Sequence, residues 1–132
     1  MQVIFKTSPS VGHKYQVILP NKIPIHFGKK NVLDYTDHRD PMMMRKQLIA
    51  RGGIVPLHVC LEEDTYEVHR EMLMVKKSTE EDWDDINTPE YWERWLLYSY
   101  PTLHQSKLWM TMREGILFQP CSDDFFYLNN SN

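Results

Sequence analysis

The chain has 132 residues, of which 42% are hydrophobic and 12% aromatic, so it can form one domain with a hydrophobic core. Its net charge of −3 is unevenly distributed. Residues 1–53 carry nine Lys or Arg against three Asp, a balance of +6, whereas residues 54–132 carry six against fifteen Asp or Glu, a balance of −9. No apolar run is long enough for a membrane helix and no secretory signal is visible, so we expect the chain inside a cell or inside something assembled there.

The first part of the chain predicts β-structure. Residues 3–5 form a short apolar run before a Ser/Pro/Gly cluster at 8–12, which indicates an arm or edge strand joined by a flexible link. Residues 15–19 and 23–27 alternate apolar and polar side chains across a short polar turn, which is typical of a β-hairpin. Pro24 favours an edge position for the second strand, and Gly28 is expected to end it. A lone hairpin is marginally stable, so it needs the helices or a third strand beneath it.

A helix is predicted from Pro41 to Arg51, after a polar connector at 29–40. Asp40 is a good N-cap, Pro41 suits the first helical position, and Gly52 and Gly53 follow the last turn. Residues 54–61 then read as a β-like apolar run, and residues 62–77 as a helix with a strand as the alternative. The acidic stretch 78–87 is expected to be a loop that Trp83 anchors.

Two further helices are predicted between Thr88 and Gly115, and they should build the core. Thr88 and Pro89 repeat the N-cap pattern, and the aromatic residues that follow fall on one face, Trp92 and Trp95 among them. Pro101 ends this helix. The next helix runs from Leu103 to about Glu114, between Thr102 as N-cap and Gly115 as the C-terminal glycine.

The fold class that follows is α+β, with an N-terminal β-hairpin packed on three or four short helices and with extended N- and C-terminal arms. We expect one domain over residues 1–132, divided into an N-terminal arm (1–13), a body (14–115) and a C-terminal arm (116–132). Deleting either 1–12 or 118–132 is expected to leave the body folded.

The strongest candidate for a catalytic or metal site is the cluster of Asp34, Asp37, His38 and Asp40. Three carboxylates and an imidazole can hold a divalent metal for phosphodiester chemistry. The favoured interpretation is local instead: Asp34 makes an Asx-type turn, Asp40 caps the next helix, and His38 bonds nearby. We therefore predict no catalytic residue, no metal ligand and no cofactor.

The two cysteines give no further site. Cys60 and Cys121 are too few for a disulfide scaffold, and we expect free thiols in a reducing compartment. His58 lies near Cys60, but no second closely spaced pair accompanies them, so a zinc site is not predicted.

The basic half offers a possible nucleic-acid surface, with Tyr15 and Tyr35 as stacking residues. The alternative is an ordinary solvated surface that contacts acidic regions of the same or a neighbouring chain. Its basic residues are Lys14, Lys22, Lys29, Lys30, Arg39, Arg45, Lys46 and Arg51.

Three segments resemble a small, uncharacterised protein family of nucleocytoplasmic large double-stranded DNA viruses. They are YQVILP with IHFG (15–20 and 25–28), DYTDHRD (34–40) and YWERWLLYSYPTL (91–103). The resemblance covers about residues 14–106. The chain departs from the family pattern in residues 53–78, which look like an insertion, and in Tyr98-Ser99-Tyr100, where a Trp is expected near Pro101.

The resemblance implies a viral origin and a place in the virus particle, and it supplies no catalytic residue. We therefore expect a non-enzymatic structural component of the virion, a minor capsid protein that bridges or cements neighbouring capsid proteins. Its partners would be the major capsid protein and other minor capsid proteins, and it would be in the host cytoplasm during assembly. The alternative function is a viral nucleic-acid-binding protein that uses the basic N-terminal half.

The expected contacts with partners combine basic and aromatic side chains, because an acidic neighbour would set the register and exposed aromatic groups would supply burial. The candidate partner-binding residues are Phe5, Lys29, Lys30, Arg39, Arg45, Trp109, Phe125, Phe126 and Tyr127.

Overall fold

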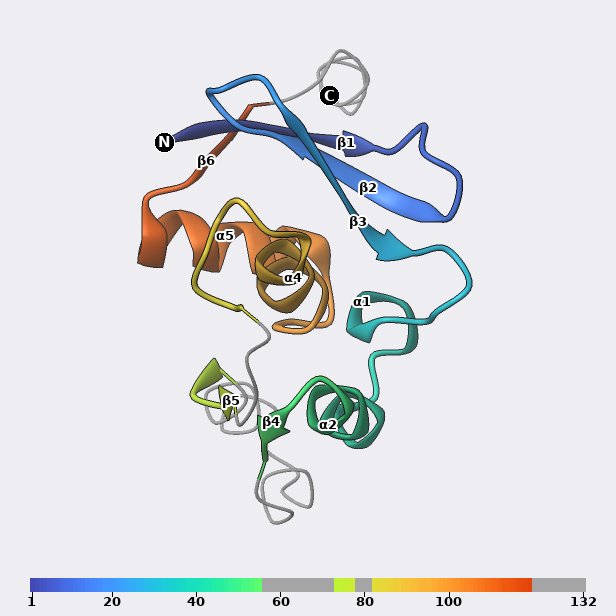
Figure 1. Cartoon of the computed structure of the whole chain (residues 1–132). Coiled ribbons are helices and arrows are strands. Elements are labelled where there is room, and N and C mark those ends of the chain that lie inside the picture. Colours follow the sequence, from blue (N-terminus) through green and yellow to red (C-terminus); the bar gives the residue numbers. More distant parts are fainter. Residues whose placement is uncertain (56–72, 78–81, 120–132) are drawn as a thin grey trace, which may run out of the picture.

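The computed structural model describes residues 1–55, 73–77 and 82–119, and its larger sheet has four strands (Figure 1). The strands are β1 (Gln2–Thr7), β2 (His13–Ile18), β3 (Pro24–Lys29) and β6 (Leu117–Gln119), in the order β3-β2-β1-β6. β2 is antiparallel to both β1 and β3, whereas β6 is parallel to β1.

The predicted hairpin is confirmed as β2 and β3. Tyr15 faces Phe27 and Val17 faces Ile25 across the pair, as the alternating pattern requires. Pro24 opens the edge strand β3, where a missing N–H donor costs no ladder bond. Gly28 lies inside β3 rather than after it, with a positive φ of 76°.

The structure refines the two expected arms, because both contribute strands to the sheet. β1 lies between β2 and β6, so it is an inner strand rather than an edge strand. Its side chains at Val3 and Phe5 are buried, with 1% and 6% of their surface exposed. Ile116 is buried as well, and β6 pairs with residues 2–4. Residues 2–7 and 116–119 therefore belong to the body of the fold.

The helix signals are confirmed at the residue level. Asp40 caps α2 (Pro41–Ala50), and Thr102 caps α5 (Leu103–Glu114), which ends at Gly115 in the left-handed region. Thr88 caps α4 (Pro89–Trp92), and the chain continues as a π-helix, η2 (Glu93–Leu97). An additional short helix, α1 (Tyr35–His38), occupies part of the expected polar connector, with Asp34 as its N-cap.

Three of the helices cover one face of the four-stranded sheet, and a smaller two-stranded sheet lies on the far side of them (Figure 1). α4, η2 and α5 lie against the sheet, and α2 lies beyond them beside a second sheet of two strands, β4 (Gly53–Ile54) and β5 (Lys76–Lys77). This is an α+β fold with the predicted hairpin and short helices. Most of the predictions for residues 54–77 fall on 56–72, outside the described residues.

The core joins the sheet to the aromatic helices, as predicted. Trp92 is fully buried, Trp83 anchors its loop at 4% exposure, and Trp95 packs half-buried against the core. Phe27 of β3 and Met110 of α5 meet them with no exposed surface. Aromatic side chains remove the largest apolar areas from water, so this cluster dominates the stabilisation. None of the helices in the described residues has the length and apolar character needed to cross a bilayer.

Candidate functional site

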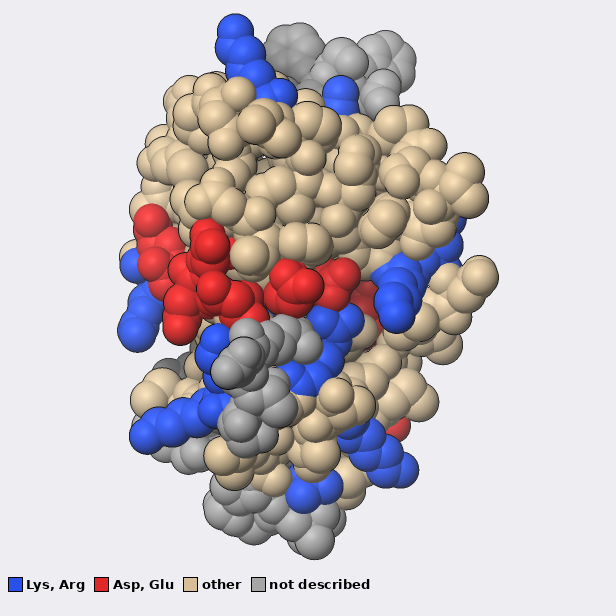
Figure 2. Space-filling view, viewed as in Figure 1, with Lys and Arg blue, Asp and Glu red and all other residues tan. Residues whose placement is uncertain are grey.

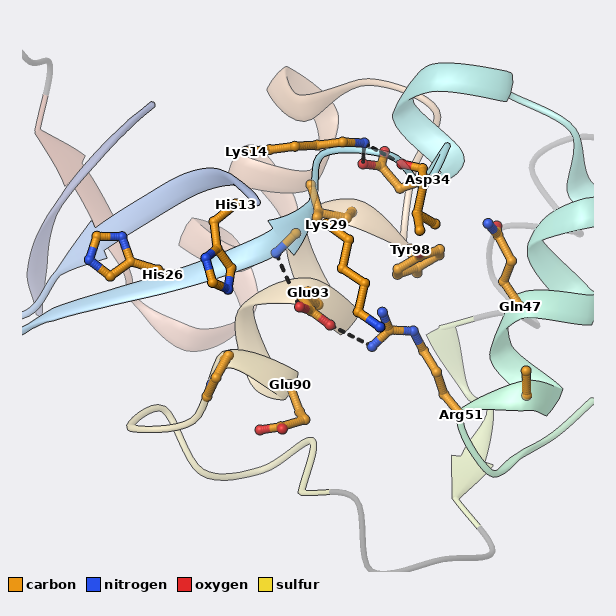
Figure 3. A pocket seen from close by; sticks show the side chains of 15 residues that line it. His13, Lys14, His26, Lys29, Asp34, Gln47, Arg51, Glu90, Glu93 and Tyr98 are labelled. Atoms are coloured by element: carbon orange, nitrogen blue, oxygen red, sulfur yellow. Dashed lines mark hydrogen bonds and ion pairs between the residues drawn. The ribbon is translucent and has the colours of Figure 1, made fainter. Parts of the chain in front are cut away.

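A pocket of about 500 Å³ lies where the hairpin meets the helices (Figure 3). Its walls come from β2 and β3, from the loop before α1, from the end of α2, and from α4 and η2. Pockets of this size commonly hold small molecules. The charged and polar side chains that line it are His13, Lys14, His26, Lys29, Asp34, Gln47, Arg51, Glu90, Glu93 and Tyr98.

Lys14 fills the position that a metal would need between Asp34 and Asp37. Its Nζ atom lies 2.8 Å from Oδ2 of Asp34 and 2.6 Å from Oδ2 of Asp37, and it donates to the carbonyl of Val32 at 2.7 Å. Burial alone would lower the pKa of Lys14, but the hydrogen bonds and negative charge of the two carboxylates raise it. The ammonium therefore offsets one of the two negative charges of Asp34 and Asp37.

The remaining predicted cluster residues serve local structure, as the favoured interpretation held. Asp34 accepts from Thr36 N in the capping box of α1, and Asp40 accepts from Met42 N at the start of α2. His38 Nδ1 accepts from Asp40 N, so its Nε2–H donates to Gln47 Oε1 at 2.8 Å. Within the residues that the structure describes, no group of three metal-ligating side chains comes together.

Glu93 lines the pocket and links η2 to β3 and to the end of α2. One carboxylate oxygen accepts the backbone N–H of Gly28 at 3.1 Å, and the other lies 2.6 Å from Nη1 of Arg51. The Arg51 guanidinium also lies over the ring of Tyr98, 4.7 Å from its centroid. β3, the end of α2 and η2 are thereby fixed relative to one another.

Two consecutive residues of the π-helix have different surroundings. Glu93 faces the pocket, whereas Arg94 is fully buried among the rings of Trp83 and Trp95, 5.2 Å and 4.4 Å from their centroids. Burial lowers the pKa of Arg94 to about 9, so its guanidinium stays charged at neutral pH. Its Nη1 donates to the carbonyl of Tyr98 at 2.6 Å. π-turns often occur beside functional sites, which agrees with the position of η2 at this pocket.

Two imidazoles line the pocket from the hairpin. The rings of His13 and His26 lie 6.0 Å apart, and Figure 3 shows them side by side. Each Nδ1 is hydrogen-bonded to a serine hydroxyl of the β1–β2 loop, His26 to Ser8 at 2.7 Å and His13 to Ser10 at 3.1 Å. The serines fix the orientation of both rings and leave each Nε2 without a partner in the described residues.

The predicted partner-binding residues that the structure describes differ in their exposure. Lys29, Lys30 and Arg39 are exposed and Arg45 is half-buried, and these four lie on β3, the loop after it, the end of α1 and α2. Trp109 is half-buried against Trp95, with ring centroids 5.1 Å apart. Phe125, Phe126 and Tyr127 lie outside the described residues.

Phe5 corrects the prediction, because it belongs to the core rather than to a contact surface. Its ring packs against Tyr15, 5.1 Å between centroids, and the ammonium of Lys107 lies 4.4 Å from its centroid on the α5 side. Only 6% of Phe5 is exposed. A partner therefore has no access to this side chain.

Several residues of the predicted nucleic-acid surface are already engaged. Lys14 is bound by two carboxylates, Arg51 by Glu93, and Tyr35 is buried. Sequence reasoning also missed His13, His26 and Glu93 as pocket residues. Neither histidine falls in a motif, and Glu93 meets Gly28 only through the tertiary fold, so no spacing in the chain signalled the pocket.

The described residues segregate charge on the surface. On the face in Figure 2, Asp and Glu gather in one band across the middle, and many Lys and Arg lie beside or below it. Residues 82–93, which we call the acidic segment, contain five Asp or Glu and no Lys or Arg. In residues 29–51 two of the three Asp bind Lys14 and the third caps α2, so the outward charge of that region is basic.

Comparison with known proteins assigns no activity. Neither the curated proteins nor the solved structures gave a match. A model of a protein family of unknown function (DUF5754) matches residues 3–51, which run from β1 to the end of α2 and include Lys14, Asp34 and Arg51 but not Glu93.

Proposed function

We propose that this chain is a non-enzymatic structural protein that joins other proteins, as a minor capsid protein of a large DNA virus particle does. The observation that carries the proposal is the separation of exposed charge. The acidic segment presents Asp84 and Asp85 to solvent, whereas Lys29, Lys30, Arg39 and Lys46 are exposed in the region of β3, α1 and α2. Such a surface pairs opposite patches of neighbours and fixes their register.

Exposed apolar side chains support the same proposal. Leu108 and Met112 lie one turn apart on α5 with 50% and 85% of their surface exposed. Leu117 on β6 adds a third apolar side chain at 49% exposure. Apolar groups that stay in water on a folded protein commonly mark contacts with other proteins. The virion setting rests on the sequence resemblance over residues 14–106.

The test is quantitative mass spectrometry of purified particles made with the natural chain or with Asp84→Lys. Asp84 is exposed in the acidic segment, so its reversal should lower the number of copies per particle several-fold. His104→Lys is the matched control, because it places the same charge on an exposed position of α5. Absence of the natural chain from particles, or equal incorporation of both variants, would reject the proposal.

A nucleic-acid-binding protein is the second candidate, favoured by the exposed Lys29, Lys30, Arg39 and Lys46. DNA binding through these residues would weaken steeply with salt, because it releases counterions from the phosphates. A gel-shift series between low and physiological salt separates the two functions. A steep salt slope that Lys29→Glu reduces would favour the nucleic-acid function over adhesion.

A further inference from the structure

We propose that the pocket beside the hairpin binds a small phosphate monoester that carries hydroxyl groups, of the sugar-phosphate class, with its phosphate on His13, His26 and Lys29. This goes beyond a role in joining proteins. The three basic side chains line the same pocket. Of these, His13 at the start of β2 and Lys29 at the end of β3 are paired across the two strands. Its volume of about 500 Å³ suits a ligand of this size.

The charge balance of the pocket leaves these three groups available. Lys14 is occupied by Asp34 and Asp37, and Arg51 by Glu93. In the described residues Lys29 has no carboxylate partner, and both imidazoles keep Nε2 free because a serine hydroxyl holds each Nδ1. Three basic side chains of one pocket that form no ion pair with a carboxylate of the described residues fit a phosphate, whose oxygens accept several charge-assisted hydrogen bonds.

Glu90 supplies the second part of the specificity. Its carboxylate lines the pocket from α4, and the structure gives it no hydrogen-bond or ion-pair partner in the part of the chain that it describes. Figure 3 shows Glu90 and the two histidines on different sides of Glu93. A carboxylate only accepts hydrogen bonds, so it selects hydroxyl groups of the ligand and repels a second phosphate.

The geometry disfavours a metal ion at the two histidines. A divalent cation held by imidazoles normally needs a third ligand, and no three ligating side chains of the described residues come together here. Lys29, which lines the same pocket, adds a positive charge, which opposes a cation and favours an anion.

The test is a titration of the ¹⁵N-labelled full chain, followed through the backbone amides of the hairpin. The probes are inorganic phosphate, ribose 5-phosphate, ribose, zinc chloride and a single-stranded DNA 20-mer. We expect saturable shifts with both phosphates, at least about tenfold tighter binding of ribose 5-phosphate than of inorganic phosphate, and no saturation with ribose. Saturation by zinc or DNA alone, or no saturation by either phosphate, would overturn the proposal.

Variants locate the site and separate its two parts. Lys29→Ala changes an exposed side chain, so it should keep the fold and weaken both phosphates about tenfold. Glu90→Gln should remove the preference for ribose 5-phosphate over inorganic phosphate. His104→Gln on the exposed face of α5 is the control and should change nothing. Unchanged affinity in Lys29→Ala and in a His13→Gln/His26→Gln double variant would overturn the assignment.

The outcome is independent of the proposed function. Phosphate binding by a chain that never enters particles would reject adhesion and support the site. Incorporation into particles without saturable phosphate binding would support adhesion and reject the phosphate site.

Discussion

The guanidinium of Arg51 lies 2.6 Å from the carboxylate of Glu93, and this contact joins the end of α2 to the π-helix η2. The two side chains are 22% and 15% exposed, so the pair is largely shielded from water. The same carboxylate accepts the N–H of Gly28. The Glu93 side chain thus pairs with the charge of Arg51 and accepts a hydrogen bond from the backbone of Gly28, although both residues are far from it in the sequence.

Removing Glu93 should destabilise the fold through the groups that it leaves behind. In Glu93→Ala the N–H of Gly28 and the Arg51 guanidinium both lose an acceptor, which should lower the free energy of unfolding by about 2 kcal/mol. Urea unfolding measures this. A double-mutant cycle with Arg51→Ala should give a coupling of about 1 kcal/mol. Glu114→Gln, at an exposed position, is the control, and an equal loss in it would contradict the explanation.

Lys14 and Asp37 should make stability depend on pH at both extremes. Burial opposes the charge of Asp37, but hydrogen bonds from Lys14 and the Asp34 backbone lower its pKa. The contribution of Asp37 is therefore present above its unfolded pKa and is lost as the pH falls through its lower folded pKa. The pKa of Lys14 is raised, so its contribution is present below its unfolded pKa and is lost as the pH rises through the folded pKa.

Asp37→Asn should therefore flatten the fall in stability below about pH 4. It should also reduce the loss of stability at alkaline pH, because Asp37 is one of the two carboxylates that raise the pKa of Lys14. Lys14→Met should abolish the alkaline loss and cost about 2 kcal/mol or more at pH 7, because the carboxylate of Asp34 is only 3% exposed. Urea unfolding from acidic to alkaline pH tests both variants. If the free energy of unfolding of Asp37→Asn fell at low pH as steeply as that of the natural chain, Asp37 would have no part in the acid dependence.

Gly28 should be intolerant of a side chain for a steric reason as well as a backbone reason. Its φ is +76°, and an added Cβ would lie 3.0 Å from Cδ1 of Leu97. Gly12 is the matched control, because its φ is +89° and nothing lies within 4 Å of an added Cβ. Both alanine variants carry the backbone strain of about 1 kcal/mol, and only Gly28→Ala should lose about 1 kcal/mol more through repacking. Equal thermal midpoints of Gly28→Ala and Gly12→Ala would show that Leu97 can move away from the added Cβ without loss of stability.

The first strand should be essential for folding, contrary to the expectation that residues 1–12 are dispensable. Deleting residues 1–7 removes the inner strand β1 and with it the buried Val3 and Phe5. Phe5→Ala alone should cost about 3 kcal/mol or more, whereas Leu108→Ala at a half-exposed site should cost about 0.5 kcal/mol. Circular dichroism and urea unfolding provide the measurement.

Deleting residues 120–132 should leave the fold intact, because the four strands of the main sheet that the structure describes lie within residues 2–119. The far-ultraviolet circular dichroism spectrum and the thermal midpoint should therefore stay close to those of the full chain. A cooperative transition in the chain that lacks residues 1–7, or an unfolded chain that ends at Gln119, would contradict the sheet order.

The sequence alone determined the parts of the fold that local chemistry decides. The helix boundaries at Asp40, Thr102 and Gly115 follow from a cap that bonds backbone groups within a few residues. The β2–β3 hairpin follows from alternation across a short turn, which needs no information from the rest of the chain. The interpretation of Asp34 as an Asx-turn residue rather than a metal ligand likewise rested on its neighbours in the chain.

The tertiary structure decided what depends on residues far apart in the chain. β1 became an inner strand because β6, more than a hundred residues later, pairs with its free edge. The pocket formed because Glu93 meets Gly28 and Arg51, and two of the acids that line it, Asp34 and Glu93, are paired with Lys14 and Arg51. Such contacts form only when the whole domain packs, so the sequence of one segment does not predict them.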